Sequence, residues 1–381
     1  MGGAAPGGIE GAGGDTTAAP RHAGLTRLRF LLIGWVVLYH LDLTLRVSLD
    51  LPSLRPVLGV GYLGVDGFFL LSGFALWLGY GARPPTGAAG IARFLLRRMA
   101  KIWPLHALAL ALLAVLVGLA LLAGVPVRDP ERFGLRDFLL QLFLVNAWET
   151  TDRHAWNYPS WALSVEWAGY LAFPLVVRAI RWLPRGAVPL VPVLALAGLG
   201  LLSVALPEVG LNFTLNYGLV RFGLEFLLGL SLGRLALEGR LPHGLLLAAA
   251  VAALPLGLLL GQDAVTVAGL AALIPAIWQG GERAAAPVAS RRRRRPDLLL
   301  RLGEASFGVY LCWVFIEAAL VLVLRGGGFG LGGRMLLMVG GFLASLVAGW
   351  LAWRFVEVPA HRWILHRRPT PPLGVTRPAA E

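Results

Sequence analysis

The sequence predicts an all-α membrane protein, a polytopic bundle of about ten transmembrane helices with both termini in the cytoplasm. Of its 381 residues, 57% are hydrophobic and only 14% are charged, a composition typical of membrane proteins and not of soluble domains. Apolar runs of roughly 17 to 25 residues, the length that spans a bilayer, recur along the chain between short basic loops. The expected spans are residues 26–46, 62–80, 103–124, 160–182, 187–206, 217–236, 243–260, 263–279, 303–324 and 335–357.

The distribution of basic residues predicts the orientation of these spans. Both chain ends are rich in arginine, and so are four internal loops: residues 83–101, 178–185, 234–240 and 282–301. The intervening loop 125–159 is balanced or slightly acidic. Because basic loops stay in the cytoplasm, both termini are expected there. We expect a multi-pass protein of the cell inner (plasma) membrane. The same arrangement explains the net charge of +13 without a nucleic-acid partner, and it makes the run Arg291–Arg295 a lipid-facing loop.

The chain is expected to have one membrane domain, residues 25–366, between two flexible ends. Residues 1–24 are mostly Gly, Ala, Thr and Pro without an apolar run, so we predict a disordered cytoplasmic lead and no signal peptide. Residues 367–381 are expected to form a flexible cytoplasmic tail. The single Cys312 lies within an expected span, which excludes an intramolecular disulfide and offers no zinc cluster. We expect no metal site.

The first expected span carries two ionisable residues, Arg29 and His40, eleven positions apart. At about 100° and ~1.5 Å per residue, they share one helix face and lie roughly 16 Å apart. An ionisable residue inside a span is costly and indicates a functional site. A neutral imidazole suits proton removal from a hydroxyl near neutral pH, and a carboxylate on its other nitrogen would fix its tautomer. We therefore predict that His40 is a general base; a structural histidine bonded to a neighbouring helix is the alternative.

Three carboxylates are expected at a depth close to that of His40, counting ~1.5 Å per residue from the predicted helix ends: Asp66, Glu166 and Glu317. Asp66 and Glu166 are candidate catalytic residues together with His40. Glu166 follows a plausible helix start at Ser160. It is expected either to orient His40 or to bind the acceptor; the alternative is a structural carboxylate that caps a helix or pairs across helices. Structural roles stay open for Asp66 and Glu317 as well.

Four cations are expected at the cytoplasmic ends of the first and third spans: Arg29, Arg97, Arg98 and Lys101. Guanidinium and ammonium groups at this level can bind the phosphates of a nucleotide. They are candidate cofactor-binding residues. The alternative is that they are ordinary snorkelling residues that set the topology.

Other polar residues in the spans are given structural roles. Arg221 and Glu225 are four positions apart and are expected to form an ion pair within one helix. Ser72 is interpreted as a small packing residue, because no base is spaced to activate it. Glu357 is expected to anchor the end of the last span.

Seven stretches of the chain match, in order, the motifs of a known family. They are Leu28-Arg-Phe with Leu38-Tyr-His40, Gly61 to Phe74, Arg97 to Leu105, Tyr158 to Trp167, Arg221 to Gly229, Ala305 to Leu311 and Phe355-Val-Glu-Val-Pro359. Between about Leu25 and Trp363 the chain thus resembles the acyltransferase-3 family of integral membrane O-acyltransferases. The resemblance implies transfer of an acyl group from acyl-CoA, either acetyl-CoA or another short acyl-CoA, to a hydroxyl of a sugar, glycan or glycosylated natural product.

Two positions depart from the family pattern. The second arginine of the pair before the third span is replaced here by Lys101, which keeps the charge but loses the bidentate fork. Family members often carry a histidine just after Tyr-Leu in the ninth span, whereas here Tyr310-Leu-Cys is followed by Trp313.

A transporter or exporter of a small polar metabolite is the alternative function. It would have the same spans, buried charges and basic cytoplasmic loops, but it would move its substrate without consuming acyl-CoA. It would also tolerate loss of Arg98 and Lys101 better than an acyl-CoA-dependent enzyme.

Overall fold

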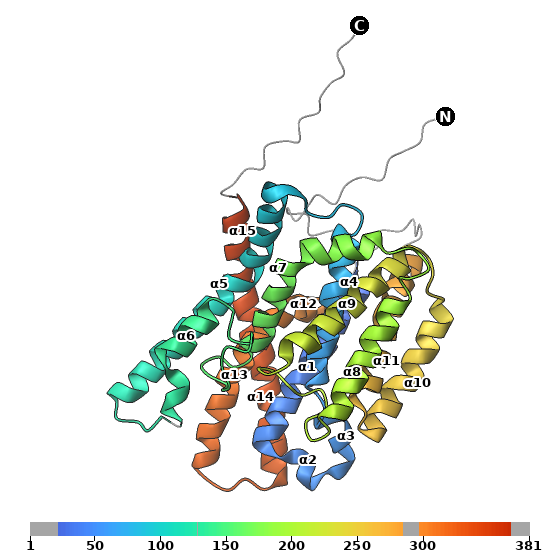
Figure 1. Ribbon diagram of the computed structural model, residues 1–381. Helices are drawn as coiled ribbons and strands as arrows, with labels where there is room; N and C mark the ends of the chain where they lie inside the picture. The colour runs from blue at the N-terminus through green and yellow to red at the C-terminus, as the bar shows by residue number, and fades with distance from the viewer. Residues whose placement is uncertain (1–21, 128, 285–296, 367–381) are drawn as a thin grey trace.

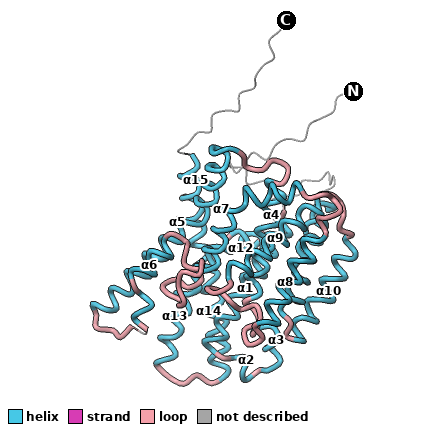
Figure 2. Tube along the Cα trace, in the orientation of Figure 1, coloured by secondary structure: helices cyan, strands magenta, loops and turns pink. Residues whose placement is uncertain are grey.

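All secondary structure in the described part of the chain is helical. The computed structural model describes residues 22–127, 129–284 and 297–366, and no strand occurs among them (Figures 1 and 2). Most of the predicted lead, the run Arg291–Arg295 and the predicted tail lie outside the described residues. Each of the ten expected spans is helical, so the all-α prediction is confirmed.

Long helices alternate with short connecting ones. The long helices are α1 (Ala23–Leu45), α4 (Leu63–Tyr80), α5 (Gly87–Leu122), α7 (Ser160–Trp182), α8 (Leu190–Ala205), α9 (Gly218–Leu237), α10 (His243–Leu260), α11 (Asp263–Ala284), α13 (Ser306–Arg325) and α14 (Leu331–Ala352). The short ones are α2 (Val47–Asp50), η1 (Pro52–Leu54), α3 (Arg55–Leu58), η2 (Pro130–Phe133), α6 (Leu135–Leu142), α12 (Leu298–Glu304), η3 (Trp353–Glu357) and α15 (Val358–His366).

Eight helical segments within the described residues are long and apolar enough to cross a membrane. Helix α8 is apolar but shorter. Helix α9 is long enough but carries three charged side chains, Arg221, Glu225 and Arg234. The polytopic membrane fold is therefore confirmed, whereas the count of ten spans stays a prediction.

The two ends of the bundle are distinguished by α15 and α2. Figure 1 shows α15 and the loop from α4 to α5 at one end, here called the α15 side, and α2 and α3 at the opposite end, the α2 side. Helix α1 leads directly into α2, so its first turns lie toward the α15 side and its last turn lies at the α2 side. Arg29 and His40 are therefore displaced from each other along the bundle axis.

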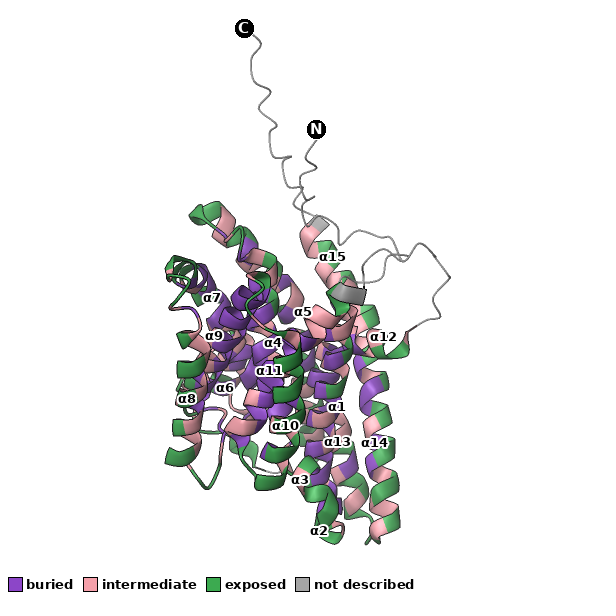
Figure 3. Ribbon diagram, turned by 90° about the vertical axis from the view of Figure 1, so that its right-hand side faces the viewer, coloured by how far each residue is buried: buried purple, intermediate pink, exposed green. Residues whose placement is uncertain are grey.

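Helix α1 is the central helix of the bundle. It contacts α4, α11, α12, α13 and α14, and its buried residues lie on every side of the helix, as expected for a helix that is enclosed by others. Figure 3 shows buried residues concentrated in the inner helices and exposed residues along α8 and α10. Arg29 and His40 each line an internal cavity from this central helix.

Helices α4 and α9 cross at a close distance because both carry glycine at the crossing point. A Cβ atom on Gly73 would meet the carbonyl oxygen of Phe226, and one on Gly229 would meet the carbonyl oxygen of Leu70. Small residues allow such backbone contact between helices in a membrane. This crossing brings a carboxylate of α4 within reach of an arginine of α9.

Candidate active site

Two cavities lie at different depths along α1. The first, here called the basic cavity, has a volume of about 480 Å³ and lies toward the α15 side. Its polar lining includes Arg29, Ser72, Arg98, Lys101, Glu166 and Tyr170. Three of the four predicted cofactor-binding residues therefore share one cavity.

The second cavity, here called the histidine cavity, has a volume of about 310 Å³ and lies toward the α2 side. The residues that line it are largely aromatic or polar, and they include His40, Tyr39, Tyr62, Tyr158, Asn212 and Thr214. The late turns of α1, the start of α4 and the loops before α7 and α9 supply these side chains. A pocket that combines aromatic surfaces with converging polar groups is typical of a small-molecule site.

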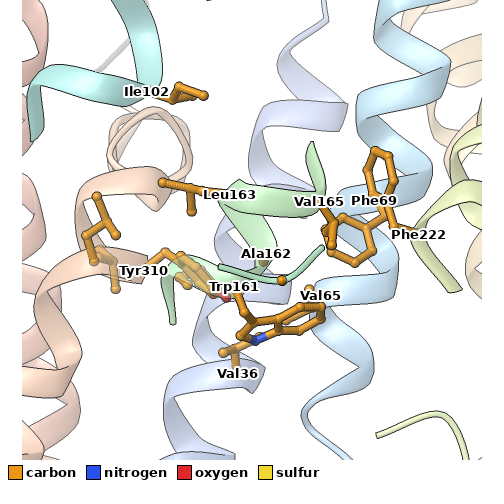
Figure 4. Packing of buried hydrophobic residues seen from close by; sticks show 14 of the residues in the cluster. Val36, Val65, Phe69, Ile102, Trp161, Ala162, Leu163, Val165, Phe222 and Tyr310 are labelled. Carbon is orange, nitrogen blue, oxygen red and sulfur yellow. The ribbon is translucent and has the colours of Figure 1, made fainter. Parts of the chain in front are cut away.

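A thin layer of side chains separates the two cavities. Val65 and Tyr310 line both of them. At the start of α7, Trp161 faces the histidine cavity and Ala162 faces the basic cavity. Figure 4 shows these four residues, which we call the dividing layer, packed together. The Tyr310 hydroxyl donates to the Pro159 carbonyl at 2.9 Å, which holds the ring in place.

His40 lies at the surface of the histidine cavity with partners on two sides. Its Nδ1 is 3.4 Å from the Tyr158 hydroxyl oxygen. Its ring is stacked on Trp313, with centroids 4.0 Å apart and planes 17° apart. The Tyr158 hydroxyl also donates to Glu317 at 3.2 Å. Tyr158 precedes α7, and its pKa is raised because the hydroxyl is buried and the Glu317 carboxylate is close. Tyr158 therefore keeps its proton.

Glu166 lies in the basic cavity. The sequence suggested that it could orient His40, but it has no hydrogen bond to His40 among the described residues. Its carboxylate accepts hydrogen bonds from Ser72 at 2.8 Å and from Tyr170 at 2.6 Å. The carboxylate linked to His40 is Glu317 instead. The hydrogen bond between Ser72 and Glu166 also changes the interpretation of Ser72, for which no nearby base was expected. Packing places the Glu166 carboxylate of α7 beside the Ser72 hydroxyl, although the two residues are 94 positions apart.

Asp66 is fully buried and forms an ion pair with Arg221 that involves two hydrogen bonds. Arg221 also donates to the Phe213 carbonyl at 3.0 Å, while its Nε lies 3.7 Å from Glu225. The expected ion pair within α9 is therefore present, and Asp66 on α4 is a second and closer partner of Arg221. The sequence could not indicate this, because Asp66 and Arg221 are 155 positions apart. Among the described contacts, Asp66 has no hydrogen bond to His40.

The cations of the basic cavity differ in their surroundings. The Arg98 guanidinium lies over three aromatic rings, at 5.6 Å from Tyr80, 5.5 Å from Phe94 and 5.7 Å from Tyr170. Such cation–π contacts stabilise it by about 0.5 to 2 kcal/mol each. Its Nε is buried without a hydrogen-bond partner among the described residues, so one donor remains for a ligand.

Lys101 lies close to both Arg29 and the carboxylate of Glu357, whose charges act on it. Glu357 ends a π-helical turn, η3, and is 8% exposed. Such turns are frequent at functional sites. The sequence indicated only an anchoring role for Glu357. Arg97, the fourth predicted cation, is exposed and does not line the basic cavity.

Sequence reasoning missed two neighbours of His40. Tyr158 was noted only as part of a motif, and Trp313 only as a departure from the family pattern. One signal was available: Thr44 is four positions after His40 on α1, and its hydroxyl donates to Glu317 at 2.8 Å. A second polar residue on the His40 face indicated that a polar partner lies opposite.

The helices define a polytopic membrane protein, and its basic cavity and histidine cavity lie on opposite sides of the dividing layer. Residues 22–354 match the acyltransferase domain family of the acyltransferase-3 type. The chain therefore belongs to this family, as its motifs indicated. This membership favours a transferase over the transporter alternative.

One relative supports the same conclusion over part of the chain. The chain is 39% identical over 137 residues to "Acyltransferase MdmB" of Streptomyces mycarofaciens. That alignment covers 35% of this chain and 32% of the relative. No solved structure matches the chain.

Proposed function

We propose that this acyltransferase moves a short acyl group from acyl-CoA, bound in the basic cavity, to a hydroxyl of an acceptor bound in the histidine cavity. The observation that carries the proposal is the dividing layer: Val65 and Tyr310 line both cavities, so the two ligands would meet across a single layer of side chains. The acceptor is proposed to be a sugar, a glycan or a glycosylated natural product.

The basic cavity suits the phosphates of CoA. Arg29, Arg98 and Lys101 supply three cations, and the buried Arg98 Nε without a partner is a donor that an anion would satisfy. Arg29 and His40 lie on α1 about 16 Å apart at ~1.5 Å per residue, a separation comparable to the length of a pantetheine arm. The arm would then carry the thioester toward His40 while the nucleotide stays among the cations.

The histidine cavity suits an acceptor that presents hydroxyl groups to an aromatic wall. Tyr39, Tyr62 and Trp161 offer ring surfaces, and Asn212 and Thr214 offer hydrogen-bonding groups. An apolar surface with a few fixed polar groups gives orientation as well as affinity. These features support an acceptor that bears hydroxyl groups, such as a sugar.

The proposed chemistry is a direct acyl transfer. His40 takes the proton of the acceptor hydroxyl as its oxygen forms an ester bond with the thioester carbonyl carbon. The carbon–sulfur bond breaks, and the CoA sulfur leaves and receives the proton from the imidazolium as the thiol. A general base of this kind contributes about 10² to 10⁴ in rate.

The test uses the purified protein, a panel of short acyl-CoA donors, and CoA release measured with and without a glycoside acceptor. We expect CoA release that depends on the acceptor, and a loss of roughly 10²- to 10⁴-fold in His40→Gln, which keeps a hydrogen-bonding shape but cannot take up a proton. His243→Gln, a histidine outside both cavities, is the matched control. No CoA release with any donor contradicts the acyl-CoA proposal, and a folded His40→Gln with parental turnover contradicts the base assignment.

A further inference from the structure

His40, Tyr158 and Glu317 form one chain of hydrogen bonds across three segments of the protein. His40 comes from α1, Tyr158 from the loop before α7 and Glu317 from α13. The links are 3.4 Å from His40 Nδ1 to the Tyr158 hydroxyl and 3.2 Å from that hydroxyl to Glu317. Thr44 donates to the second oxygen of Glu317 at 2.8 Å, so both carboxylate oxygens have partners.

The number of protons in this chain determines the tautomer of His40. A tyrosine hydroxyl carries one hydrogen, and an ionised carboxylate can only accept. Tyr158 therefore donates to Glu317, and its oxygen accepts from an N–H on His40 Nδ1. In a neutral imidazole the other nitrogen, Nε2, then carries the lone pair. The structure shows no hydrogen bond to Nε2 among the described residues.

We propose that Tyr158 and Glu317 are positioning residues that hold His40 in the tautomer whose Nε2 accepts the proton of the acceptor hydroxyl. This inference rests on the proposed function. The imidazolium formed in the reaction would be stabilised by the Glu317 carboxylate through Tyr158, and by the indole of Trp313 stacked on it, since an aromatic face attracts a cation. The logic is that of a serine–histidine–aspartate triad, with a tyrosine hydroxyl inserted between histidine and carboxylate.

Other groups that face His40 do not replace Glu317. The Tyr39 ring meets the imidazole edge-on at 4.9 Å. The remaining titratable and charged groups that line the cavity are Tyr62, Arg132, His154, Arg221 and Tyr310. The arginines and a protonated histidine disfavour an imidazolium, and Arg221 is already paired with Asp66. Glu317 is the carboxylate linked to His40 through hydrogen bonds.

The test compares Glu317→Gln, Tyr158→Phe and the double variant with the parent. In Glu317→Gln the new amide can donate to the tyrosine oxygen, which turns the Tyr158 hydrogen toward Nδ1 and leaves Nε2 protonated. We expect kcat to fall about 10- to 100-fold in each single variant. This is less than the roughly 10²- to 10⁴-fold loss expected when the general base itself is removed. The KM values for donor and acceptor should change little. Because both residues act through one chain, the double variant should be no slower than the slower single variant.

The pH profile separates positioning from a purely structural role. Activity requires neutral His40, so the rate falls as pH drops through its pKa. Removing the Glu317 charge disfavours the imidazolium, so the acid limb of kcat should move to lower pH in Glu317→Gln. If Glu317 had only a structural role, its substitution would reduce the amount of folded protein and leave the acid limb of kcat at the same pH. An acid limb that does not move in Glu317→Gln would overturn the proposal.

Two controls and one comparison complete the experiment. Glu208→Gln and Tyr217→Phe make the same changes at exposed positions outside both cavities and should leave kcat and the limb unchanged. Tyr158→Phe keeps the ring, whose centroid is 5.3 Å from that of Trp313, so it tests the hydroxyl even if Glu317→Gln fails to fold. If His40→Gln is inactive but both single variants are parental, only this inference fails; if His40→Gln is active, the proposed base itself fails.

Discussion

The residues around His40 show how a single imidazole is fixed by partners from distant parts of the chain. Trp313 covers one ring face, and Tyr158 meets Nδ1. Each contact determines a different property of the ring. Stacking on Trp313 determines the orientation of its plane, and the hydrogen bond with Tyr158 determines which nitrogen carries the proton. Substitution of either neighbour should therefore change the chemistry of His40 without removing the histidine.

At Arg98, loss of the guanidinium should affect the donor more than the acceptor. Arg98→Ala removes a cation of the basic cavity together with its contacts to Tyr80, Phe94 and Tyr170. We expect the KM for acyl-CoA to rise about tenfold, equivalent to about 1.4 kcal/mol, with a smaller change in the KM for the acceptor. Initial rates at varied concentrations of each substrate give both values.

Arg93→Ala is the matched control for Arg98→Ala, because Arg93 lies on the same helix, is exposed and donates to the Ala89 carbonyl. Its donor KM should equal that of the parent. Lys101→Arg restores the planar fork and should be at least as active as the parent. If the donor KM of Arg98→Ala is unchanged, Arg98 does not bind acyl-CoA, and the alternative that these cations only set the membrane topology is favoured.

Sequence reasoning identified the individual polar residues better than their partners. The Arg29 to His40 spacing is a property of one helix, so it could be calculated from helix geometry. The partner of His40 depends on how α1, α7 and α13 pack, and hydrophobic runs do not determine which faces meet. For this reason Glu166 was considered as a partner of His40, whereas the structure links Glu317 to His40 and bonds Glu166 to Ser72.

At the scale of helices, the crossing of α4 and α9 positions the buried ion pair. Gly73 and Gly229 let the two backbones touch, and Asp66 and Arg221 pair between the same helices. Both charged residues are almost completely buried, and Arg221 lines the histidine cavity. Sequence could locate both helices from their apolar runs, but it could not show that they are neighbours.

A larger residue at this crossing should destabilise the protein. In Gly229→Leu the side chain would meet the Leu70 carbonyl of α4 and force the helices apart, at a cost of about 1 to 3 kcal/mol or more for overpacking. We expect a lower unfolding temperature and less monodisperse protein, measured by thermal denaturation and size exclusion in detergent.

Gly223→Leu is the control on the same helix, because no atom lies within 4 Å of a Cβ at Gly223. Its unfolding temperature should match that of the parent. If Gly229→Leu and Gly223→Leu are equally stable, the backbones of α4 and α9 are not in contact at Gly229.

At the scale of the whole molecule, arginine-bearing connections gather at the α15 side. Arg234 donates to the Ile180 carbonyl, and Arg240 donates to the Arg185 carbonyl at 2.5 Å. These contacts place the α7–α8 and α9–α10 connections together, as the alternating loop charges predicted. They support an orientation in which the α15 side faces the cytoplasm.

Reporter fusions test this orientation. Because arginine-rich loops remain in the cytoplasm, fusions after Arg185, Arg240 and Arg293 should report inside, and fusions near Glu131 and Glu208 should report outside. An outside signal after Arg185 or Arg240 would place the basic cavity, and with it the proposed acyl-CoA site, away from the cytoplasm. An outside signal after Arg293 would change the predicted number of spans.

The dividing layer also has a consequence for the membrane that holds the protein. Val65 and Tyr310 line both cavities. In the proposed transfer, the layer that the acyl group must reach across would also keep ions and protons from leaking through the bundle. Smaller side chains in this layer would admit longer acyl chains but would also raise the permeability of the membrane to ions. Under this arrangement, a preference for short acyl groups and an intact membrane potential depend on the same few side chains.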